Sequence, residues 1–341
     1  MKTLVIGPSW VGDMLMSQSL YRHLKKQNPA REINVLAPDW CRPVLERMPE
    51  VNTAIAMPVG HGSLQWRIRK QLGQSLSEQG YEQAFILPNS LKSALIPWFA
   101  KIPVRSGWRG EMRYGLINDL RILDKQAFPL MVQRYVALSL PKSSPALQLA
   151  EILPPHLRVD GAVQQNTISS FQLDAASSIA FCPGAEFGPA KRWPDFHYAE
   201  LARKLIAKGH SIWLFGSAKD VVVCEQIIAQ LSKQEQQRCV NLAGKTSLPQ
   251  AIDLIAACNA TVCNDSGLMH IAAAVNTPLV ALYGPTSPGF TPPLSDQATI
   301  IRLIDGFIKI RKGDADQGYH QSLIDITPDM AFSAVQERLS A

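Results

Sequence analysis

The sequence predicts an α/β protein with two doubly wound domains, each built on a parallel sheet covered by helices. The chain has 341 residues, which suits two domains of roughly 150 residues each better than one compact core. Short apolar runs alternate with helical patterns, as in βαβ units. This alternation stops between Pro141 and Asp174 and then starts again.

The two halves carry two series of expected elements. In the first half, strands are expected at 2–7, 33–37, 53–57, 83–87 and 103–107, and helices at 13–27, 40–48, 64–79 and 90–99. In the second half, strands are expected at 178–182, 211–215, 239–242, 260–263 and 279–283. Helices are expected there at 195–208, 219–231, 248–257, 267–275 and 328–339.

The interruption predicts the connection between the domains. It contains Pro141, Pro145, Pro154 and Pro155, followed by the polar run 164–170. We therefore expect domains at 1–170 and 171–341, with the last helix a candidate to pack back on the first domain. Doubly wound sheets bind ligands beyond the carboxyl ends of their strands, so the chemistry is expected in the loops that follow strands.

The composition excludes several classes of protein. With 46% hydrophobic and 18% charged residues, the chain is neither disordered nor fibrous. A net charge of +6 suits an anionic ligand or surface but does not indicate nucleic acid. The six cysteines form no C-x-x-C pair, and we expect buried thiols in a reducing compartment. The short apolar N-terminus predicts a strand and no signal peptide. The sequence contains no run of about 18 apolar residues, so we expect no membrane span. We expect a cytoplasmic protein.

The first strand is followed by the loop Gly7-Pro8-Ser9-Trp10-Val11-Gly12-Asp13. Its glycine spacing imitates a P-loop, but Asp13 and Met14 stand where Lys and Ser or Thr are required, which argues against a nucleotide triphosphatase. The dinucleotide pattern G-x-G-x-x-G is also missing. Asp13 has two interpretations: a helix N-cap, which this loop alone favours, or a general base for a sugar hydroxyl.

The loop at 183–194 places Lys191 and Arg192 after a strand. A lysine and an arginine in such a loop can bind a diphosphate, although a solvated basic turn is an equal alternative. The run Cys263-Asn264-Asp265-Ser266-Gly267-Leu268-Met269-His270 is more specific. A strand ends there and a helix opens at once, so its free N–H groups form an anion site. We expect His270 to contact the ligand, against the alternative of a structural histidine.

Other loops complete the expected rim. Ser217 and Thr246 lie in loops that could hold a nucleoside, and Thr286 and Ser287 lie in a turn that is either structural or ligand-binding. The stretch 98–114 contains Arg109 and Arg113 among tryptophans and a tyrosine. It suits an acidic, partly apolar substrate or a membrane interface, with a solvated loop as the alternative.

Asp314-Ala315-Asp316 has the D-x-D form of metal-dependent glycosyltransferases. It follows a basic turn at 310–313 and not an apolar strand, so we expect no metal site there. No other set of carboxylate and histidine residues has good ligand spacing, and metal-free catalysis is expected.

Taken together, these loops resemble the ADP-heptose:lipopolysaccharide heptosyltransferases, most closely the type II branch. The resemblance covers essentially the whole chain and is least clear at 141–176. It is carried by GPSWVGDMLMSQSLYRHLK, LPNSLKSALIPWFA, GWRGEMRYG, FCPGAEFGPAKRWP, NDSGLMHIAAA and LYGPTSPGFTPPL. Type I members have Thr-Thr before the phosphate-binding lysine, where this chain has Ala185-Glu186, and this difference favours type II.

The resemblance implies a GT-B fold, in which two Rossmann-like domains face a central cleft, and an inverting, metal-independent transfer. ADP-heptose would be the donor and the first heptose of the Kdo–lipid A inner core the acceptor. Peripheral contact with the inner membrane and no nucleic acid are expected. The implied catalytic residues are Asp13 as base and Lys191 at the phosphate. The expected donor-binding residues are Glu186, Lys191, Arg192, Ser217, Thr246, Asp265, Ser266, Gly267 and His270, and the expected acceptor-binding residues are Ser9, Trp10, Arg109 and Arg113.

Alternative functions remain at this point. A type I enzyme or a transferase for another nucleotide sugar would share the architecture. A nicotinamide oxidoreductase would also be α/β but lacks its glycine fingerprint here. A carbohydrate-binding protein without activity would have no need for a base opposite a phosphate site.

Overall fold

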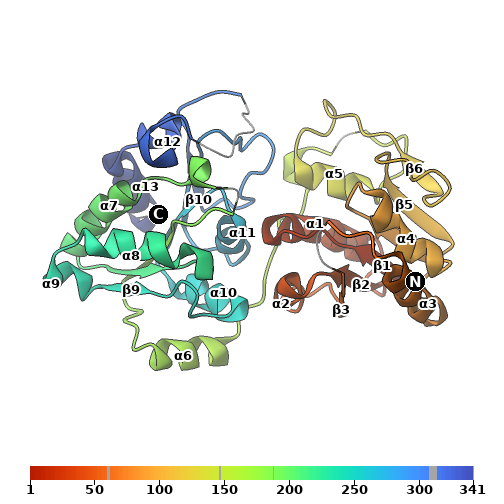
Figure 1. Cartoon of the computed structure of the whole chain (residues 1–341), viewed down its shortest axis with the longest axis horizontal. Helices are drawn as coiled ribbons and strands as arrows, with labels where there is room; N and C mark the ends of the chain where they lie inside the picture. The colour runs from red at the N-terminus through yellow and green to blue at the C-terminus, as the bar shows by residue number, and fades with distance from the viewer. Residues whose placement is uncertain (60–61, 146, 187, 307–312, 341) are drawn as a thin grey trace. The chain divides into compact units, whose positions relative to one another are not determined.

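The structure is a computed structural model that describes residues 1–59, 62–145, 147–186, 188–306 and 313–340 (Figure 1). The chain divides into two compact units, Met1–Leu157 and Arg158–Ala341. Each unit contains one six-stranded sheet, and every strand pair in both sheets is parallel. The predicted fold class is therefore confirmed.

The sheet of the first unit has the order β3-β2-β1-β4-β5-β6. The chain runs from β1 to β3 in one direction and then returns to β4, so the order reverses between β1 and β4. This reversal opens a crevice at the carboxyl ends of the two strands in folds of this class. The elements are β1 (Lys2–Ile6), α1 (Val11–Gln27), β2 (Glu32–Ala37), η1 (Asp39–Cys41), α2 (Arg42–Leu45), β3 (Thr53–Ala56), α3 (Trp66–Leu76), η2 (Ser77–Gln79), β4 (Gln83–Ile86), α4 (Leu91–Phe99), β5 (Val104–Trp108), β6 (Asp119–Arg121), α5 (Met131–Ala137) and η3 (Leu149–Glu151).

The sheet of the second unit has the order β12-β11-β10-β7-β8-β9, and its reversal lies between β7 and β10. Every residue of β7 and β10 is buried, as expected for central strands covered on both faces. The elements are α6 (Gly161–Ser170), β7 (Ser178–Cys182), η4 (Pro189–Lys191), α7 (Asp195–Ala207), β8 (Ser211–Leu214), η5 (Ala218–Asp220), α8 (Val221–Ala229), α9 (Lys233–Gln236), β9 (Cys239–Asn241), α10 (Leu248–Ala257), β10 (Ala260–Asn264), α11 (Gly267–Ala274), β11 (Leu279–Leu282), β12 (Ala298–Ile301), η6 (Asp316–Gly318), α12 (Gln321–Ile324) and α13 (Pro328–Ser340).

The division between the units differs from the boundary expected near residue 170. The polar run taken for a linker forms α6, which Asp160 caps by accepting hydrogen bonds from the N–H groups of Ala162 and Val163. The N–H of Asp160 donates to Asp253 Oδ1 at 2.9 Å, and Gln164 Nε2 donates to Asp253 O at 2.7 Å. These bonds attach α6 to α10, so the helix belongs to the second unit.

The last helix is part of the second unit's own packing. The helix α13 packs against α7, β10, β11 and β12 of that unit. Its residues Ala331, Ala334 and Val335 are part of that unit's hydrophobic core. The helix therefore covers an apolar face of the second unit's sheet.

Two further expectations concern thiols and the membrane. All six cysteines are free, and all are buried except Cys239, which is half-buried, so the prediction of buried thiols holds for the others. Along the described ranges, no helix combines the length and the apolar composition that crossing a bilayer requires.

Candidate functional site

The loops that follow β7 and β10 lie next to each other, because these strands are paired in the sheet with Cys182 opposite Cys263. The first loop ends in η4, which carries Lys191, and the second carries Asp265. Lys191 Nζ lies 2.8 Å from Asp265 Oδ2, and the two side chains are 18% and 9% exposed. The predicted basic loop and the Asn-Asp-Ser-Gly run therefore meet at one place.

Only two residues lie between the end of β10 and the start of α11, a close succession that the sequence predicted. Ser266 is its N-cap residue in an extended conformation, and its side chain makes no capping hydrogen bond to the helix. Gly267 is the first helical residue. Backbone N–H groups in the first turn of a helix lack intrahelical partners and favour an anion. The position next to Asp265 and Lys191 makes this the candidate phosphate site.

His270 lies in the first turns of α11 with 6% of its surface exposed. Burial lowers its pKa to about 4, and this effect outweighs the opposing influence of Asp265. The imidazole is therefore neutral at pH 7 in the ligand-free protein. It can still donate or accept one hydrogen bond.

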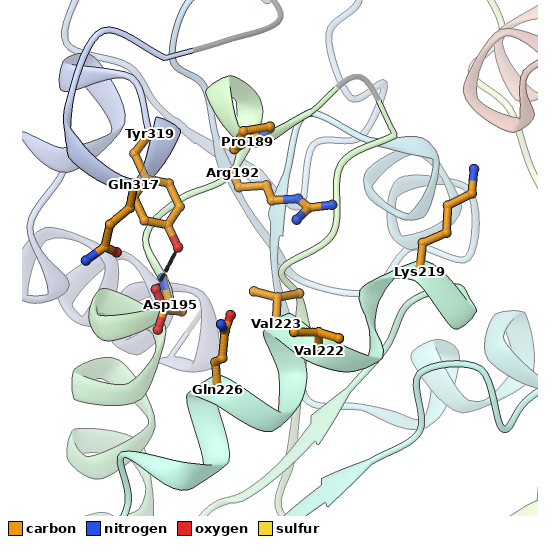
Figure 2. Close-up of a pocket in the computed structure, with 9 residues that line it drawn as sticks. All are labelled: Pro189, Arg192, Asp195, Lys219, Val222, Val223, Gln226, Gln317 and Tyr319. Atoms are coloured by element: carbon orange, nitrogen blue, oxygen red, sulfur yellow. Dashed lines mark hydrogen bonds between the residues drawn. The ribbon is translucent and has the colours of Figure 1, made fainter.

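Lys191 and Arg192 have different neighbours, although both were expected at the diphosphate. Arg192 Nη2 lies 3.6 Å from Asp220 Oδ1. It lines a pocket of about 490 Å³ (Figure 2). The described lining residues include neither Lys191 nor Asp265; they are Pro189, Arg192, Asp195, Lys219, Val222, Val223, Gln226, Gln317 and Tyr319. Lys191, the last residue of η4, and Arg192, the extended residue after it, thus contact different groups.

Several polar side chains of the expected donor set already have partners. Glu186 Oε1 and Lys219 Nζ are 2.7 Å apart, and both side chains are exposed. Ser217 Oγ donates to Asp220 Oδ2 at 2.8 Å and accepts from the N–H of Lys219. These contacts order the turn after β8, and a nucleoside would have to compete with them or bind beside them.

Two other threonines of the expected rim, Thr246 and Thr286, make contacts with backbone groups. Thr246 Oγ1 is 3.4 Å from Leu242 O, and the residue is half-buried. Thr286 is buried, and its carbonyl oxygen accepts a hydrogen bond from Arg302 Nε, which supports a structural role for this turn.

Asp13 is not the N-cap of α1, which was the simpler interpretation of this residue. The N-cap is Trp10, and Asp13 lies inside the first turn, where a carboxylate interacts favourably with the helix dipole. Asp13 is half-buried and close enough to Cys41 and Tyr135 to raise the pKa of both groups, although burial is the larger cause in each. A cap role therefore does not account for this carboxylate.

The loop after β1 also borders a small cavity of the first unit. Ser9 accepts a hydrogen bond from Trp40 Nε1 through its carbonyl oxygen, at 2.8 Å. An added Cβ at Gly7 would lie 2.7 Å from Met14 Cε and 3.3 Å from Leu36 O, so a larger residue in this close turn would require its neighbours to shift. The cavity has a volume of about 120 Å³ and is lined by Ile6, Gly7, Ser9, Leu36, Pro38, Trp40, Met57, Val59, Arg69, Pro88, Ser90, Lys92 and Ser93.

Arg113 was expected to bind the acceptor, and the structure corrects this expectation. Its side chain is 1% exposed, and burial lowers the pKa of its guanidinium to about 10. It donates to Pro88 O at 2.6 Å, Asn89 Oδ1 at 3.0 Å and Trp108 O at 2.5 Å. Arg113 therefore joins the loops after β4 and β5 from inside. Arg109 is exposed and remains a candidate for acceptor binding.

The D-x-D motif is part of a local turn. Asp314 Oδ1 accepts from the N–H of Gln321 at 2.9 Å, and Asp314 Oδ2 lies 3.9 Å from His320 Nε2. Residues 310–312 of the basic turn that argued against a metal site lie outside the described residues. In the described part of the chain, no group of three His, Cys, Asp or Glu side chains could hold a metal ion.

Comparison with known proteins assigns the chain to a family. The profile of glycosyltransferase family 9 (heptosyltransferase) matches residues 69–320. The lipopolysaccharide heptosyltransferase 2 of Escherichia coli strain K12 is 61% identical over 345 residues, which cover 99% of each chain. The chain belongs to glycosyltransferase family 9. The resemblance seen in the sequence motifs is thereby confirmed.

Other relatives of this family 9 enzyme agree. The lipooligosaccharide heptosyltransferase 2 of Haemophilus influenzae is 59% identical, and the alignment covers 100% of both chains. The solved structure of E. coli ADP-heptose lps heptosyltransferase II matches with a TM-score of 0.89 at 55% identity, covering 100% of this chain and 99% of that one. The predicted GT-B fold is thus confirmed. A type 1 enzyme from Pseudomonas aeruginosa is only 25% identical over 85% of this chain, so the type II resemblance is the stronger.

Sequence reasoning missed residues that hold the site together. Asn264, Asp220 and Trp193 are buried and contact the loops that carry the predicted ligand-binding residues. Asn264 belongs to the Asn-Asp-Ser-Gly run and stands directly before Asp265. A buried polar residue inside an apolar strand was the available signal, because such a group requires partners.

Proposed function

We propose that this family 9 glycosyltransferase transfers L-glycero-D-manno-heptose from ADP-heptose to the first heptose of the Kdo–lipid A inner core. This is the type II reaction of lipopolysaccharide core biosynthesis. The observation that carries the proposal is the 61% identity to lipopolysaccharide heptosyltransferase 2 across 99% of both chains. The contact of Lys191 with Asp265 beside the start of α11 supports it, because it places a cation at a helix N-terminus.

On the donor side, we propose that the diphosphate of ADP-heptose binds at Lys191 and the first N–H groups of α11. Without the donor, Lys191 is paired with Asp265 at 2.8 Å, so the diphosphate competes for a cation that is already in place. Once Lys191 contacts phosphate, the Asp265 carboxylate can accept hydrogen bonds from sugar hydroxyls. The neutral His270 contributes a hydrogen bond and no charge.

On the acceptor side, we propose Asp13 as the general base, with Ser9, Trp10 and Arg109 as acceptor contacts. The acceptor oxygen bonds to the anomeric carbon while the bond from that carbon to the diphosphate breaks. ADP leaves with the electron pair, and the proton of the acceptor hydroxyl passes to the Asp13 carboxylate. This single displacement inverts the anomeric centre.

We propose that the transfer needs no metal ion. The leaving diphosphate gains negative charge as the bond breaks, and a lysine with oriented N–H groups stabilises such charge. Lys191 and the start of α11 supply both at the proposed phosphate position.

The acceptor carries lipid A, so we propose a cytoplasmic enzyme that works at the inner face of the inner membrane. Exposed aromatic side chains of the first unit support this location, among them Trp98, Tyr114 and Trp66. Aromatic side chains of this kind favour the interface between water and lipid.

A direct assay tests the proposed function. ADP release is measured with ADP-heptose and either heptosyl-Kdo₂–lipid A or Kdo₂–lipid A, with and without a chelator. We expect release with the heptosylated acceptor and not with the other. Turnover of Kdo₂–lipid A alone would instead indicate a type I enzyme, and preference for another nucleotide sugar would overturn the donor assignment.

A further inference from the structure

Asn264 is the last residue of β10 and is completely buried. Its amide connects to both ends of the loop that runs from β7 to α7. Oδ1 accepts a hydrogen bond from the backbone N–H of Trp193 at 3.0 Å. Nδ2 donates to the carbonyl oxygen of Pro183 at 2.8 Å and lies 3.5 Å from that of Gly184. One side chain thus joins the beginning and the end of loop 183–193.

The end of this loop is anchored by further buried contacts. Tyr198 donates its hydroxyl to Asn264 Oδ1 at 3.3 Å, and its ring packs edge-on against Trp193 with centroids 4.8 Å apart. Trp193 Nε1 donates to Ile326 O at 2.7 Å. The Asn264 amide accepts from the end of the loop through its oxygen and donates to the beginning of the loop through its NH₂ group, whereas an ionised carboxylate lacks the donor and an aliphatic side chain lacks both.

The same amide bears on the ionic contact at the proposed phosphate site. Asp265 follows Asn264 directly, and Lys191 precedes Trp193 by two residues. The 2.8 Å contact between Lys191 and Asp265 therefore forms between loop 183–193 and the segment after β10. The hydrogen bonds of Asn264 join these same two segments close to the contact. A shift of loop 183–193 relative to β10 would separate these two side chains.

We propose that Asn264 is a positioning residue for the donor. It holds loop 183–193 against the end of β10 so that Lys191 and Asp265 address the same ligand. Asn264 acts through these residues and contacts no substrate itself. This inference rests on the proposed function insofar as the ligand is taken to be ADP-heptose.

The first test compares kinetic parameters of Asn264→Ala with those of the unchanged enzyme. We expect kcat/KM for ADP-heptose to fall about 10- to 100-fold, as for a misplacement of about 1 Å at a reactive site. The KM for the acceptor should stay unchanged. Asn264→Asp keeps the shape but removes the donor hydrogens, and it should show the same selective loss. If Asn264→Ala does not fold, the same measurement is made on Asn264→Ser, for which we expect a smaller fall in kcat/KM for ADP-heptose.

Two control variants separate positioning from a general loss of stability. Asn259 lies just before the other end of β10, and its Oδ1 accepts from the backbone N–H of Ser178 at 2.9 Å. Thr277 is buried and donates its hydroxyl to Ile255 O at 3.0 Å. Asn259→Ala and Thr277→Val each remove one hydrogen bond between a side chain and the backbone in the same unit. We expect both variants to lower the unfolding temperature and to leave the KM for ADP-heptose unchanged.

A second readout does not depend on the identity of the donor. In the ligand-free protein, backbone amides of 188–193 should exchange hydrogen faster in Asn264→Ala than in Asn259→Ala. Unchanged exchange together with unchanged donor kinetics would overturn the positioning role, as would an equal rise of donor and acceptor KM. If the unchanged enzyme released no ADP from ADP-heptose, the proposed function would fail, while the exchange comparison would still decide the role of Asn264.

Discussion

Removal of the Lys191 ammonium group tests the donor site most directly. Lys191 and Asp265 are both largely buried and 2.8 Å apart, so their charges are poorly screened by water. If Lys191 also meets the leaving diphosphate, Lys191→Ala should cost about 2–4 kcal/mol of transition-state stabilisation. At about 1.4 kcal/mol per factor of ten, this corresponds to a fall in kcat/KM of roughly 30- to 1,000-fold.

The folded protein should lose stability in the same variant. Asp265 would keep a largely buried carboxylate without its lysine partner, and breaking a charged hydrogen bond costs about 1.5–3 kcal/mol. Asp265→Asn in the Lys191→Ala background removes the stranded charge and should recover part of this loss. Thermal unfolding of the single and double variants measures the coupling.

The assay is steady-state ADP release, with the KM for each substrate determined separately. Lys191→Ala should affect both the KM for ADP-heptose and kcat, because the contact forms before the transition state and strengthens in it. Lys191→Arg keeps the charge and serves as the matched control. Normal kinetics for both substrates in Lys191→Ala would refute the reasoning and leave only a structural ion pair.

Further predictions concern the base, the buried histidine, the two arginines and the metal. Asp13→Asn should slow transfer by about 10²–10⁴ while leaving ADP-heptose binding intact, and near-normal turnover would reduce Asp13 to a helix-dipole partner. Burial holds the pKa of His270 at about 4, below its unfolded value, so the unfolded chain binds more protons between about pH 4 and 6.5 and stability falls as the pH is lowered through this window. His270→Gln should remove about 2 kcal/mol of that pH dependence in urea unfolding measured at pH 7 and pH 4.5. Arg113→Ala should lower the unfolding free energy by about 2–4 kcal/mol because it removes several buried hydrogen bonds, whereas Arg109→Ala should leave stability unchanged and raise only the acceptor KM. Activity should survive dialysis against EDTA, and a large loss restored by magnesium or manganese would contradict the proposed charge stabilisation.

Much of the fold was predictable because central parallel strands are recognisable locally. The run Ser178–Cys182 is apolar and entirely buried, and its predicted and observed bounds coincide. Two of the four edge strands, β6 and β12, were not predicted, whereas the edge strands β3 and β9 were. The edge strands β6 and β12 are only half-buried for most of their lengths, so neither shows a continuous apolar pattern.

The helix α6 was mistaken for a linker because its stability comes from distant contacts. Its sequence is polar, with only Thr167 buried. Its attachment depends on Asp253, which lies about ninety residues away along the chain. Local propensity could not indicate this partner.

The sequence by itself determined which loops are candidates for the functional site. Strand ends, helix starts and their glycines are encoded by neighbouring residues, so Asp13, Lys191 and Asp265 could be singled out as candidates. Tertiary structure alone decided which side chains reach solvent and which meet. It buried Arg113 among carbonyl groups, joined Lys191 to Asp265 and directed Arg192 to Asp220. These outcomes depend on packing between segments far apart in the chain, where burial and hydrogen-bond satisfaction override the local preference of each residue.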